Sequence, residues 1–299
     1  MKLISGSSNP DFAKNLSTRL GLETISIEIS KFANGEKRIW IKDKIEGENI
    51  AFVQSFSDPT DENIMEFLLI TDALERLGAR HIHAIIPWMG YSLQDKSFRL
   101  GEPIAAKVVA NLVSNSYVKR ATLLDIHNSS VPGFFTIPTQ NLSAISLFTE
   151  YVRQSFDLNE IVVASPDFGG LKRAHMFANE LHTNLVNVDK HRDLSTGEVT
   201  AQSLQGGSVE GKIVVVFDDS ILSGGTVLEA SKLLKEKGAK EVHFLATHPV
   251  LTQGAREKLS HESIDSVVVA NTIVQKDLPP KVTILDASEL FANALKAWI

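Results

Sequence analysis

Short runs of Ile and Val that are apolar at successive positions recur along this chain, and segments with apolar residues three or four apart lie between them. Continuous apolar runs are typical of strands covered on both faces, as in a parallel sheet, whereas the wider spacing predicts amphipathic helices. Strands that alternate with helices predict an α/β fold. We expect strands over 48–56, 81–88, 120–127, 160–166, 184–189, 212–219 and 241–250, and helices over 61–79, 102–115 and 226–239.

The composition is that of a chain able to form full hydrophobic cores, with 43% hydrophobic and 22% charged residues. A length of 299 residues favours two domains of roughly 150 residues each. The formal net charge of −6 argues against a nucleic-acid partner, because binding a phosphate backbone needs a basic surface.

The sequence gives no sign of a membrane or secretory role. No apolar run reaches the roughly 18 residues that span a bilayer, and the start, MKLISGSSNP, lacks the apolar segment of a secretory signal. The absence of cysteine excludes disulfides and thiolate chemistry and fits a reducing compartment. We therefore expect a cytoplasmic enzyme with no membrane partner.

The chain contains an internal repeat. The segment LERLGARHIHAI, from Leu74, matches LKEKGAKEVHFL, from Leu234, at an offset of 234 − 74 = 160 residues. A Leu, the Gly-Ala pair, a basic residue, a β-branched residue and a His coincide. A generic helix–Gly–strand junction is the alternative, but an offset near half the chain length favours two similar α/β domains.

The segment VVVFDDSILSGGTV, residues 214–227, places two adjacent carboxylates and then Ser-Gly-Gly-Thr where a strand passes into a helix. In open α/β sheets ligands bind beyond the carboxyl ends of the strands, and a helix N-terminus favours an anion. Gly224 and Gly225 let backbone N–H groups turn toward a phosphate, and Ser223 and Thr226 add hydroxyl donors. The first half of the chain has no such motif.

The two carboxylates need a different ligand, because they would repel a phosphate. Sugar hydroxyls or a Mg²⁺ ion suit the oxygens of Asp218 and Asp219. The alternative is a plain strand-to-helix turn in which Asp caps the helix and Gly eases the bend. The complete pattern of strand, two Asp and SGGT favours a site for a sugar phosphate.

This segment resembles the ribose-5-phosphate-binding signature of the type I phosphoribosyltransferase fold. Six further segments resemble, in the same order, those of the ribose-phosphate diphosphokinases (PRPP synthetases), which make the substrate of the transferases. They are KFANGEKRIW, QSFSDPTDENIMEFLLITDALERLGARHIHAIIPWMGYSLQDK, GEPIAAKVVANLV, DIHNSSVPGFF, SPDFGGLKRA and VDKHRD.

The resemblance implies two tandem phosphoribosyltransferase-like domains, each with a mainly parallel sheet flanked by helices. The N-terminal domain, over 1–143, would serve the nucleotide, and the C-terminal domain, over 144–299, would carry the ribose-phosphate turn. The implied reaction transfers the β,γ-diphosphoryl group of ATP to the 1-hydroxyl of ribose 5-phosphate, with PRPP and AMP as products. It also implies Mg²⁺ and a homo-oligomer, either a dimer or a dimer-based hexamer, whose ATP site lies at a subunit interface.

The resemblance assigns roles to particular residues. Lys190 and Arg192 would belong to a mobile catalytic loop that closes over the phosphates, although a solvated basic tip is the alternative. His127 and Asp167 would hold or adjoin the metal, where the alternatives are a strand-end histidine and a helix cap. The 5-phosphate and ribose hydroxyls would bind to Asp218, Asp219, Ser223, Gly224, Gly225 and Thr226.

The nucleotide would bind to two segments of the first half. An apolar ring to stack the base and polar groups to read its edge are what an adenine pocket requires. One segment would reach the site from a neighbouring subunit. The residues implied are Phe32, Asn34, Gly35 and Glu36 in that segment, with Gln94 and Asp95 in the second.

The chain departs from the family pattern at several positions. Leu93 stands where most bacterial relatives have Arg, so a cation expected near the ATP phosphates is missing, and Lys96 or Arg99 is the candidate replacement. Asn34 replaces the usual Asp, and Leu222 the usual acid before the turn. The spacing of QDKSFRLGEPI and the DIHN segment look more like archaeal-type synthetases.

Two other functions remain open from the sequence. A nucleobase phosphoribosyltransferase would use the same turn, but it has no need of an ATP-binding first half. A non-catalytic, synthetase-like subunit is favoured by Leu93 and opposed by the presence of His127, Asp167, Lys190 and Arg192. A catalytic synthetase would release AMP when the purified chain alone is given ATP, Mg²⁺ and ribose 5-phosphate, so this assay distinguishes it from the two alternatives.

Overall fold

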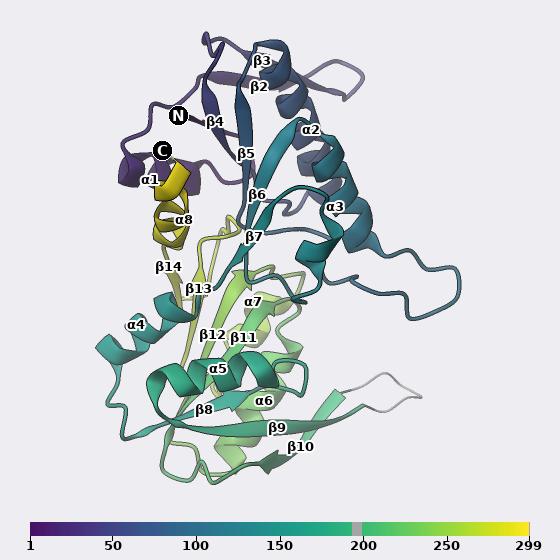
Figure 1. The fold of residues 1–299 in the computed structure, drawn as a ribbon. Coiled ribbons are helices and arrows are strands. Elements are labelled where there is room, and N and C mark those ends of the chain that lie inside the picture. The colour runs from purple at the N-terminus through teal and green to yellow at the C-terminus, as the bar shows by residue number, and fades with distance from the viewer. Residues whose placement is uncertain (193–198, 299) are drawn as a thin grey trace. The chain divides into compact units, whose positions relative to one another are not determined.

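The computed structural model describes residues 1–192 and 199–298, of which 190–192 and 199–202 are described for their backbone alone. The described chain forms two compact units (Figure 1). The first contains Met1–Ser143, Thr272–Val274 and Asp286–Ile299, and the second contains Ala144–Asn271 and Gln275–Leu285. Among the described residues, every helix is too short or too polar to cross a lipid bilayer.

The first unit has a five-stranded sheet in the order β1-β4-β5-β6-β7, in which all neighbours are parallel. A separate antiparallel hairpin joins β2 to β3. The central strands are buried at successive positions, as expected for strands covered by helices on both faces. The strands are β1 (Lys2–Ser5), β2 (Ile27–Lys31), β3 (Lys37–Ile41), β4 (Asn49–Val53), β5 (His81–Ile86), β6 (Val118–Leu124) and β7 (Thr139–Leu142).

The helices of the first unit bury one apolar face each. In α2, residues Ile64, Phe67, Ile70 and Leu74 are spaced by three or four and are buried. The helices are α1 (Pro10–Leu20), α2 (Thr60–Arg76), α3 (Ala105–Asn115) and α8 (Ser288–Leu295), with 3₁₀ turns η1 (Val131–Phe134) and η2 (Lys296–Trp298).

The second unit has a seven-stranded sheet in the order β10-β9-β8-β11-β12-β13-β14. All pairs are parallel except β9 with β10, which form an antiparallel edge. The strands are β8 (Ile161–Ser165), β9 (Asn184–Arg192), β10 (Val199–Gln205), β11 (Ile213–Ile221), β12 (Glu241–Pro249), β13 (Ser266–Ala270) and β14 (Val282–Leu285), and the helices are α4 (Ile145–Ser155), α5 (Leu171–Leu181), α6 (Gly225–Glu236) and α7 (Ala255–Leu259).

The predicted α/β fold is confirmed, and the expected strands and helices are all present with shifted ends. β11 ends at Ile221, two residues beyond the predicted end at 219, and Asp218 and Asp219 lie within the strand as expected. The reason is its pairing with β12, which continues to Ile221, whereas its pairing with β8 stops at Val216.

The C-terminal segment departs from the domain division expected from the sequence, which assigned 144–299 to one domain. Residues Asp286–Ile299 belong to the first compact unit. The reason is the apolar face of α8, where Phe291 is fully buried and packs edge-on against Phe12 of α1, with the ring centres 5.3 Å apart. Arg19 of α1 adds an ion pair of 3.0 Å to Asp286. In Figure 1 the labelled N and C ends lie near each other above these helices.

Candidate active site

The carboxyl end of β11 presents two neighbouring carboxylates. Beyond Val216 this strand has a partner on one side only, so the far side of Asp218 and Asp219 opens toward the turn that follows β8. Both side chains are largely buried, with 15% and 5% of their surfaces exposed. Asp218 also accepts a hydrogen bond from the backbone N–H of Asp219 at 2.8 Å.

Arg173 of α5 binds both carboxylates and was not singled out from the sequence. Its guanidinium lies 3.1 Å from Asp218 Oδ1 and 3.3 Å from Asp219 Oδ2. The basic residue in SPDFGGLKRA was the available signal, but one Lys-Arg pair on a helix does not reveal which carboxylate it faces. A guanidinium fork suits two adjacent carboxylates, because it places several donors in one plane.

The turn between β8 and α5 brings a third carboxylate to the same place. Asp167 accepts a hydrogen bond from Gly170 N at 3.0 Å, and Ser165 Oγ donates to Asp167 O at 2.7 Å. A Cβ at Gly170 would lie only 3.3 Å from Asp218 Oδ1, so glycine allows this turn to approach β11 closely. The predicted metal residue Asp167 and the predicted ribose-binding residue Asp218 therefore lie close together in the structure.

The electrostatics of this acidic cluster (Asp167, Asp218 and Asp219) favour a cation. Burial raises the pKa of Asp218, the negative charges of Asp219 and Asp167 raise it further, and Arg173 opposes them. Arg173 pairs with Asp218 and Asp219 of this cluster and so lowers the repulsion between the two carboxylates. Among the described residues no group of three side chains has ligand geometry for a metal. This donor set fits Mg²⁺, which is held by one or two carboxylates with water and substrate phosphates as its other ligands.

The turn from β11 into α6 leaves the first amides of the helix without a side-chain cap. Gly224 lies just before α6 with φ of 70°, in the left-handed region that favours glycine. A Cβ there would meet Ala255 O at 3.2 Å, which gives a second reason for glycine. Ser223 Oγ lies 3.5 Å from Gly225 N, at the limit of a hydrogen bond, so the hydroxyl remains available to another partner. Uncapped amides at a helix N-terminus are donors suited to an anion.

The two predicted catalytic residues lie at the end of β9. The backbone of this strand reaches Arg192 and pairs with β10 in antiparallel register, with Lys190 opposite Ala201 and Arg192 opposite Val199. The side chains of Lys190 and Arg192 lie outside the described part of the chain, as does the loop 193–198.

In the first unit, the ends of β5 and β6 bring together part of the predicted nucleotide and metal residues. Asn128 donates a hydrogen bond to Asp95 Oδ2, which joins the segment after β6 to the GYSLQD segment. His127 is exposed beside Asn128 and lies three residues beyond the end of β6, where the sequence predicted the strand end itself. Gln94 is exposed and its carbonyl accepts from Ala106 N at 3.1 Å.

The other predicted nucleotide segment is the exposed turn of the β2–β3 hairpin. Phe32 and Glu36 close the turn through a backbone bond of 2.8 Å, and Gly35 has φ of 90°. Glu36 N donates to Asn34 Oδ1 at 3.2 Å, and the Phe32 ring is 53% exposed. Among the described residues, no hydrogen bond or ion pair joins this turn to the Gln94–Asp95 segment, and in Figure 1 the turn between β2 and β3 lies well away from the loop between β5 and α3.

A buried ion pair anchors this hairpin next to its turn, and no sequence pattern predicted it. Glu66 of α2 is fully buried and lies 2.6 Å from Lys37 Nζ of β3. The carboxylate also accepts from Ser7 N at 2.6 Å, from Ser7 Oγ at 2.8 Å and from Gln54 Nε2 at 3.0 Å. Every lone-pair direction of Glu66 is thus occupied from within the unit.

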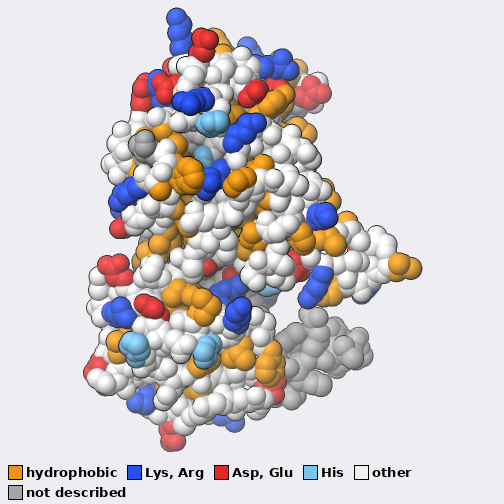
Figure 2. All heavy atoms as spheres, viewed as in Figure 1, with side chains coloured by type: hydrophobic (Ala, Val, Ile, Leu, Met, Phe, Trp, Pro, Cys, Tyr) orange, Lys and Arg blue, Asp and Glu red, His pale blue; other side chains and the backbone are white. Residues whose placement is uncertain are grey.

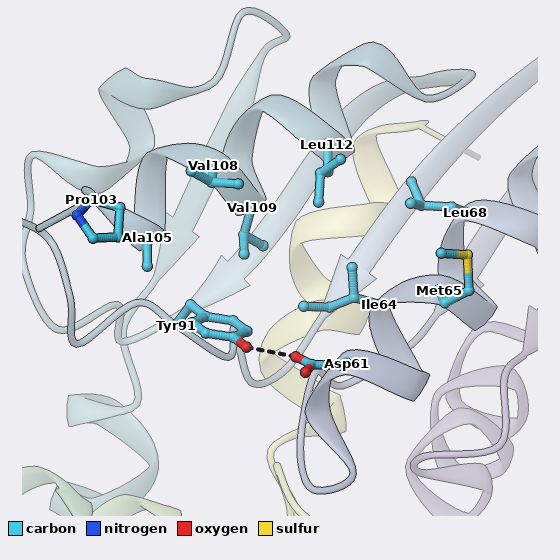
Figure 3. Close-up of a pocket in the computed structure, with 10 residues that line it drawn as sticks. All are labelled: Asp61, Ile64, Met65, Leu68, Tyr91, Pro103, Ala105, Val108, Val109 and Leu112. Carbon is cyan, nitrogen blue, oxygen red and sulfur yellow. Dashed lines mark hydrogen bonds between the residues drawn. The ribbon is translucent and has the colours of Figure 1, made fainter.

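A mainly apolar cavity of about 430 Å³ lies between α2 and α3 beside the GYSLQD segment (Figure 3). Its polar groups are Asp61 and Tyr91, which share a hydrogen bond of 2.6 Å. No cation is among the described residues that line it, so it does not suit a triphosphate. The lining residues are Asp61, Ile64, Met65, Leu68, Tyr91, Pro103, Ala105, Val108, Val109 and Leu112.

Comparisons with known proteins identify the family. Residues 1–116 match the model of the N-terminal domain of ribose phosphate pyrophosphokinase, and residues 195–298 match that of a phosphoribosyl synthetase-associated domain. A ribose-phosphate pyrophosphokinase of Wolinella succinogenes is 38% identical over 295 residues, 99% of this chain and 94% of the relative. One from Thermotoga maritima is 35% identical over 297 residues, with the same coverage of 99% and 94%.

A solved structure agrees with these matches. The phosphoribosylpyrophosphate synthetase of Mycobacterium smegmatis is 32% identical, with a TM-score of 0.91 over 99% of this chain and 98% of the other. The sequence and structural similarities cover nearly the whole length of the chain and of its relatives, so they include both units. The chain belongs to the ribose-phosphate pyrophosphokinase family.

Proposed function

We propose that this protein is a ribose-phosphate diphosphokinase that converts ATP and ribose 5-phosphate into PRPP and AMP. In this reaction O1 of the sugar forms a bond to the β-phosphorus of ATP, the bond between that phosphorus and the oxygen bridging to the α-phosphate breaks, and the 1-hydroxyl loses its proton. The observation that carries the proposal is the buried pair Asp218–Asp219 beside an uncapped helix N-terminus, in a chain that matches the family over its full length.

The ribose phosphate is proposed to lie across the β11–α6 turn. The amides of Gly224 and Gly225 and the hydroxyls of Ser223 and Thr226 would receive the 5-phosphate, because anions bind where uncapped amides converge. Asp218 and Asp219 would accept hydrogen bonds from the ribose hydroxyls. Arg173 holds both carboxylates in place in the unliganded chain, and its charge lowers the pKa of Asp218 and so favours the ionised form of that carboxylate.

Phosphoryl transfer needs positioning and charge neutralisation more than covalent assistance. Lys190 and Arg192 at the end of β9 are proposed to contact the transferred phosphates and stabilise the charge that develops there. Mg²⁺, when bound, would neutralise the charge of the triphosphate. Asp167 with the neighbouring acidic cluster would supply hard oxygen donors for it, and His127 is the other proposed metal residue.

The first unit is proposed to serve the nucleotide and the second the sugar phosphate, with the division near 143 and 144. Phe32 offers an exposed ring for stacking, with Asn34, Gly35 and Glu36 beside it, and Gln94 and Asp95 form the second surface. Because the two surfaces are separate within one chain, a second copy is proposed to supply the hairpin, which makes the enzyme a homo-oligomer. The proposed compartment is the cytoplasm.

The experiment is an assay of the purified full chain with ATP, Mg²⁺ and ribose 5-phosphate, with AMP and PRPP as the readout. A synthetase releases both in equal amounts. Formation of neither product, with the chain folded and binding ATP, would assign a non-catalytic role, for which Leu93 is the feature in favour. Consumption of PRPP with a nucleobase would instead assign a phosphoribosyltransferase.

A single variant tests the proposed catalytic loop. Lys190→Ala should lower turnover by about a hundredfold or more with an unchanged melting temperature, because it removes a cation that would act on the transition state. Lys212→Ala, a half-buried lysine just before β11, is the matched control and should retain turnover. Turnover near that of the parent in Lys190→Ala would remove this residue from the mechanism.

A further inference from the structure

The inward face of the β2–β3 hairpin changes character along its length. Two cross-strand pairs pack on the core of the first unit, and they are Ile27 with Ile41 and Ile29 with Ile39. Side chains of a strand alternate between its two faces, so the next pair on the inward face is Lys31 with Lys37. The hairpin is therefore held by apolar contacts over most of its length and by charge at the pair nearest its turn.

The two lysines need counter-charges, because like charges directly opposite each other on neighbouring strands repel. Two glutamates one helical turn apart on α2 supply them. The Glu66 carboxylate lies 2.6 Å from Lys37 Nζ. The Glu62 carboxylate lies 2.8 Å from Lys31 Nζ and 3.8 Å from Lys37 Nζ, and we name these four residues the lysine–glutamate cluster. Figure 2 shows blue basic and red acidic side chains interspersed at the top of the view, where Figure 1 labels β2 and β3.

The buried half of the lysine–glutamate cluster is fixed to the central sheet. Glu66 is fully buried and accepts hydrogen bonds from Ser7 and Gln54, which lie just beyond the carboxyl ends of β1 and β4. The side chain of Lys37 is only 11% exposed. A buried carboxylate with several donors has little freedom to move, so the sheet fixes the position of Lys37.

The exposed half of the cluster holds the other side of the turn. The side chains of Lys31 and Glu62 are 50% and 46% exposed. Lys31 is the last residue of β2 and Lys37 is the first residue of β3, so the turn 32–36 lies directly between the two lysines. Both ends of this turn are therefore tied to α2 by ion pairs.

The internal repeat shows that the two acids accompany the hairpin. At the offset of 160 residues, Glu62 and Glu66 correspond to Leu222 and Thr226, which carry no charge. In the part of the chain that the structure describes, the second unit has no hairpin separate from its main sheet. The acids are thus present in the unit whose hairpin presents the exposed ring of Phe32 and absent from the other.

We propose that the lysine–glutamate cluster positions the nucleotide-binding turn, by holding residues 32–36 in one orientation on α2 before ATP binds. This role rests on the proposed function, in which the turn contacts the adenine of ATP. The four residues act through the turn and are positioning residues. A turn that is ordered in the unliganded chain loses less conformational entropy on binding, so the cluster raises the affinity for ATP without acting on the transferred phosphates.

The half-exposed pair Lys31–Glu62 allows a test that leaves the fold intact. Glu62→Gln should raise the KM for ATP by about fivefold, the factor expected for one exposed ion pair whose whole effect falls on the ordering of the turn. The kcat, the KM for ribose 5-phosphate and the melting temperature should not change. With the parent chain active, an unchanged KM for ATP in Glu62→Gln would overturn the proposal.

The same hairpin offers a matched control. The Glu28 carboxylate lies 3.0 Å from Lys42 Nζ, the two side chains are also about half-exposed, and this pair lies toward the end of the hairpin remote from the turn. Glu28→Gln changes the charge of the first unit by the same amount and should leave the KM for ATP unchanged. An equal rise in Glu28→Gln and Glu62→Gln would assign the effect to net charge and overturn the proposal.

Reversal of the pair distinguishes positioning from direct contact with ATP. Lys31→Glu alone places two acids side by side and should raise the KM for ATP. Lys31→Glu combined with Glu62→Lys restores an ion pair and the net charge, and should return the KM to within about twofold of the parent value. If Lys31 instead contacted the phosphates of ATP, the double variant would bind ATP as poorly as Lys31→Glu, and this result would overturn the proposal.

Amide hydrogen exchange follows the turn in the absence of substrate. The turn is closed by backbone bonds from Phe32 N to Glu36 O at 2.8 Å and from Gly35 N to Phe32 O at 2.9 Å. Glu62→Gln should speed exchange of the peptide covering 31–37 by about fivefold and leave the five-stranded sheet unchanged. Exchange as slow as in the parent would overturn the proposal alone, whereas a parent chain that releases no AMP would overturn the proposed function and this role with it.

Discussion

The segment β4–α2–β5 of the first unit and the segment β11–α6–β12 of the second share their backbone in detail. Gly78 and Gly238 have φ of 79° and 86°, and a Cβ on either would lie 3.2 Å from the Cγ of a glutamate, Glu46 or Glu210. Gly47 N donates to Gly78 O at 2.8 Å, and the corresponding bond in the second unit is also 2.8 Å. The two segments therefore share one backbone conformation at the junction between helix and strand.

The two segments differ at the edge of the sheet where we propose that ligands bind. Val53 pairs with Ile85 as Phe217 pairs with Leu245, so the positions of Asp218 and Asp219 are taken in the first unit by Gln54 and Ser55. Gln54 is fully buried and is held by Ser8 Oγ at 2.9 Å and Glu66 at 3.0 Å. Neutral residues thus occupy, in the first unit, the place of the two carboxylates that Arg173 binds in the second.

The helix that follows completes the contrast. At the offset of 226 − 160 = 66, Glu66 corresponds to Thr226 of the proposed phosphate turn. Its buried carboxylate accepts hydrogen bonds from Ser7 and Lys37, so an anionic group of the protein itself occupies this part of the first unit. A fold that can bind an anion at a helix start is therefore closed in one unit by its own glutamate and left open in the other. The following predictions test this contrast, beginning with the largest effect.

Asp218→Asn should lower turnover by about a thousandfold, because the proposed ribose contact and the charge of the cluster are both lost. The melting temperature should stay the same or rise, since burial and the charge of Asp219 disfavour the ionised form of this carboxyl. Steady-state kinetics and calorimetry measure the two effects. Asp72→Asn, on the exposed surface of α2, is the control. Turnover like that of the parent would show that the open edge of β11 is not where the sugar binds.

Glu66→Gln should destabilise the chain by about 3 kcal/mol, because it removes the nearer counter-charge of the largely buried Lys37 and leaves the more distant Glu62, at 3.8 Å. Thr226→Ala, at the corresponding position, should change stability by less than about 0.5 kcal/mol and should instead raise the KM for ribose 5-phosphate. Urea unfolding and initial rates distinguish the two variants. Similar stability losses at both positions would contradict the contrast between a closed and an open site.

Stability should fall by about 3 kcal/mol as the pH is lowered from 6.5 to 4, through the buried His83. The folded pKa of this histidine lies below the unfolded value, so the unfolded chain takes up the proton first and stability is lost on acidification. Urea midpoints across this pH window, compared between the parent and His83→Gln, isolate the effect. An equally steep pH dependence in His83→Gln would assign the loss to other groups.

Gly78→Ala and Gly238→Ala should each destabilise the chain by about 1 kcal/mol. Both glycines have a backbone φ in the left-handed region, which alanine adopts at a cost. The two values should agree closely, since the backbone and the facing glutamate are the same in each unit. Thermal unfolding measures both. A large difference between them would show that the two segments are less alike energetically than in geometry.

Much of the fold could be predicted from local pattern. The apolar runs of β5 and β11 and the three-to-four spacing of α2 gave the α/β fold, because burial of one face or of both leaves a direct trace in sequence. The exposed hairpin strands β2 and β3 and the C-terminal helix α8 were not predicted. Their stability comes from contacts with distant residues, such as Phe291 on Phe12.

The candidate site, like the fold, could be predicted from the sequence only in part. The acids and glycines of VVVFDDSILSGGTV are predicted to bind a sugar phosphate because such a ligand needs those residue types at that spacing, and this role stays a prediction. The pairing of Arg173 with both aspartates and the closure of the first unit by Glu66 could not, since each depends on which helix faces which strand. The side chains of Lys190 and Arg192 remain predictions from the resemblance.

The sequence by itself determined the layered α/β units, their duplication and the chemical character of the β11–α6 turn. Those properties follow from periodicity and from the conformational demands of single residues such as Gly224. Only the tertiary structure decided that in the first unit the buried carboxylate of Glu66 occupies the position at which the second unit has its proposed phosphate turn. Charge pairing acts through space, so the partner of a buried ion is fixed by packing rather than by its neighbours in the chain.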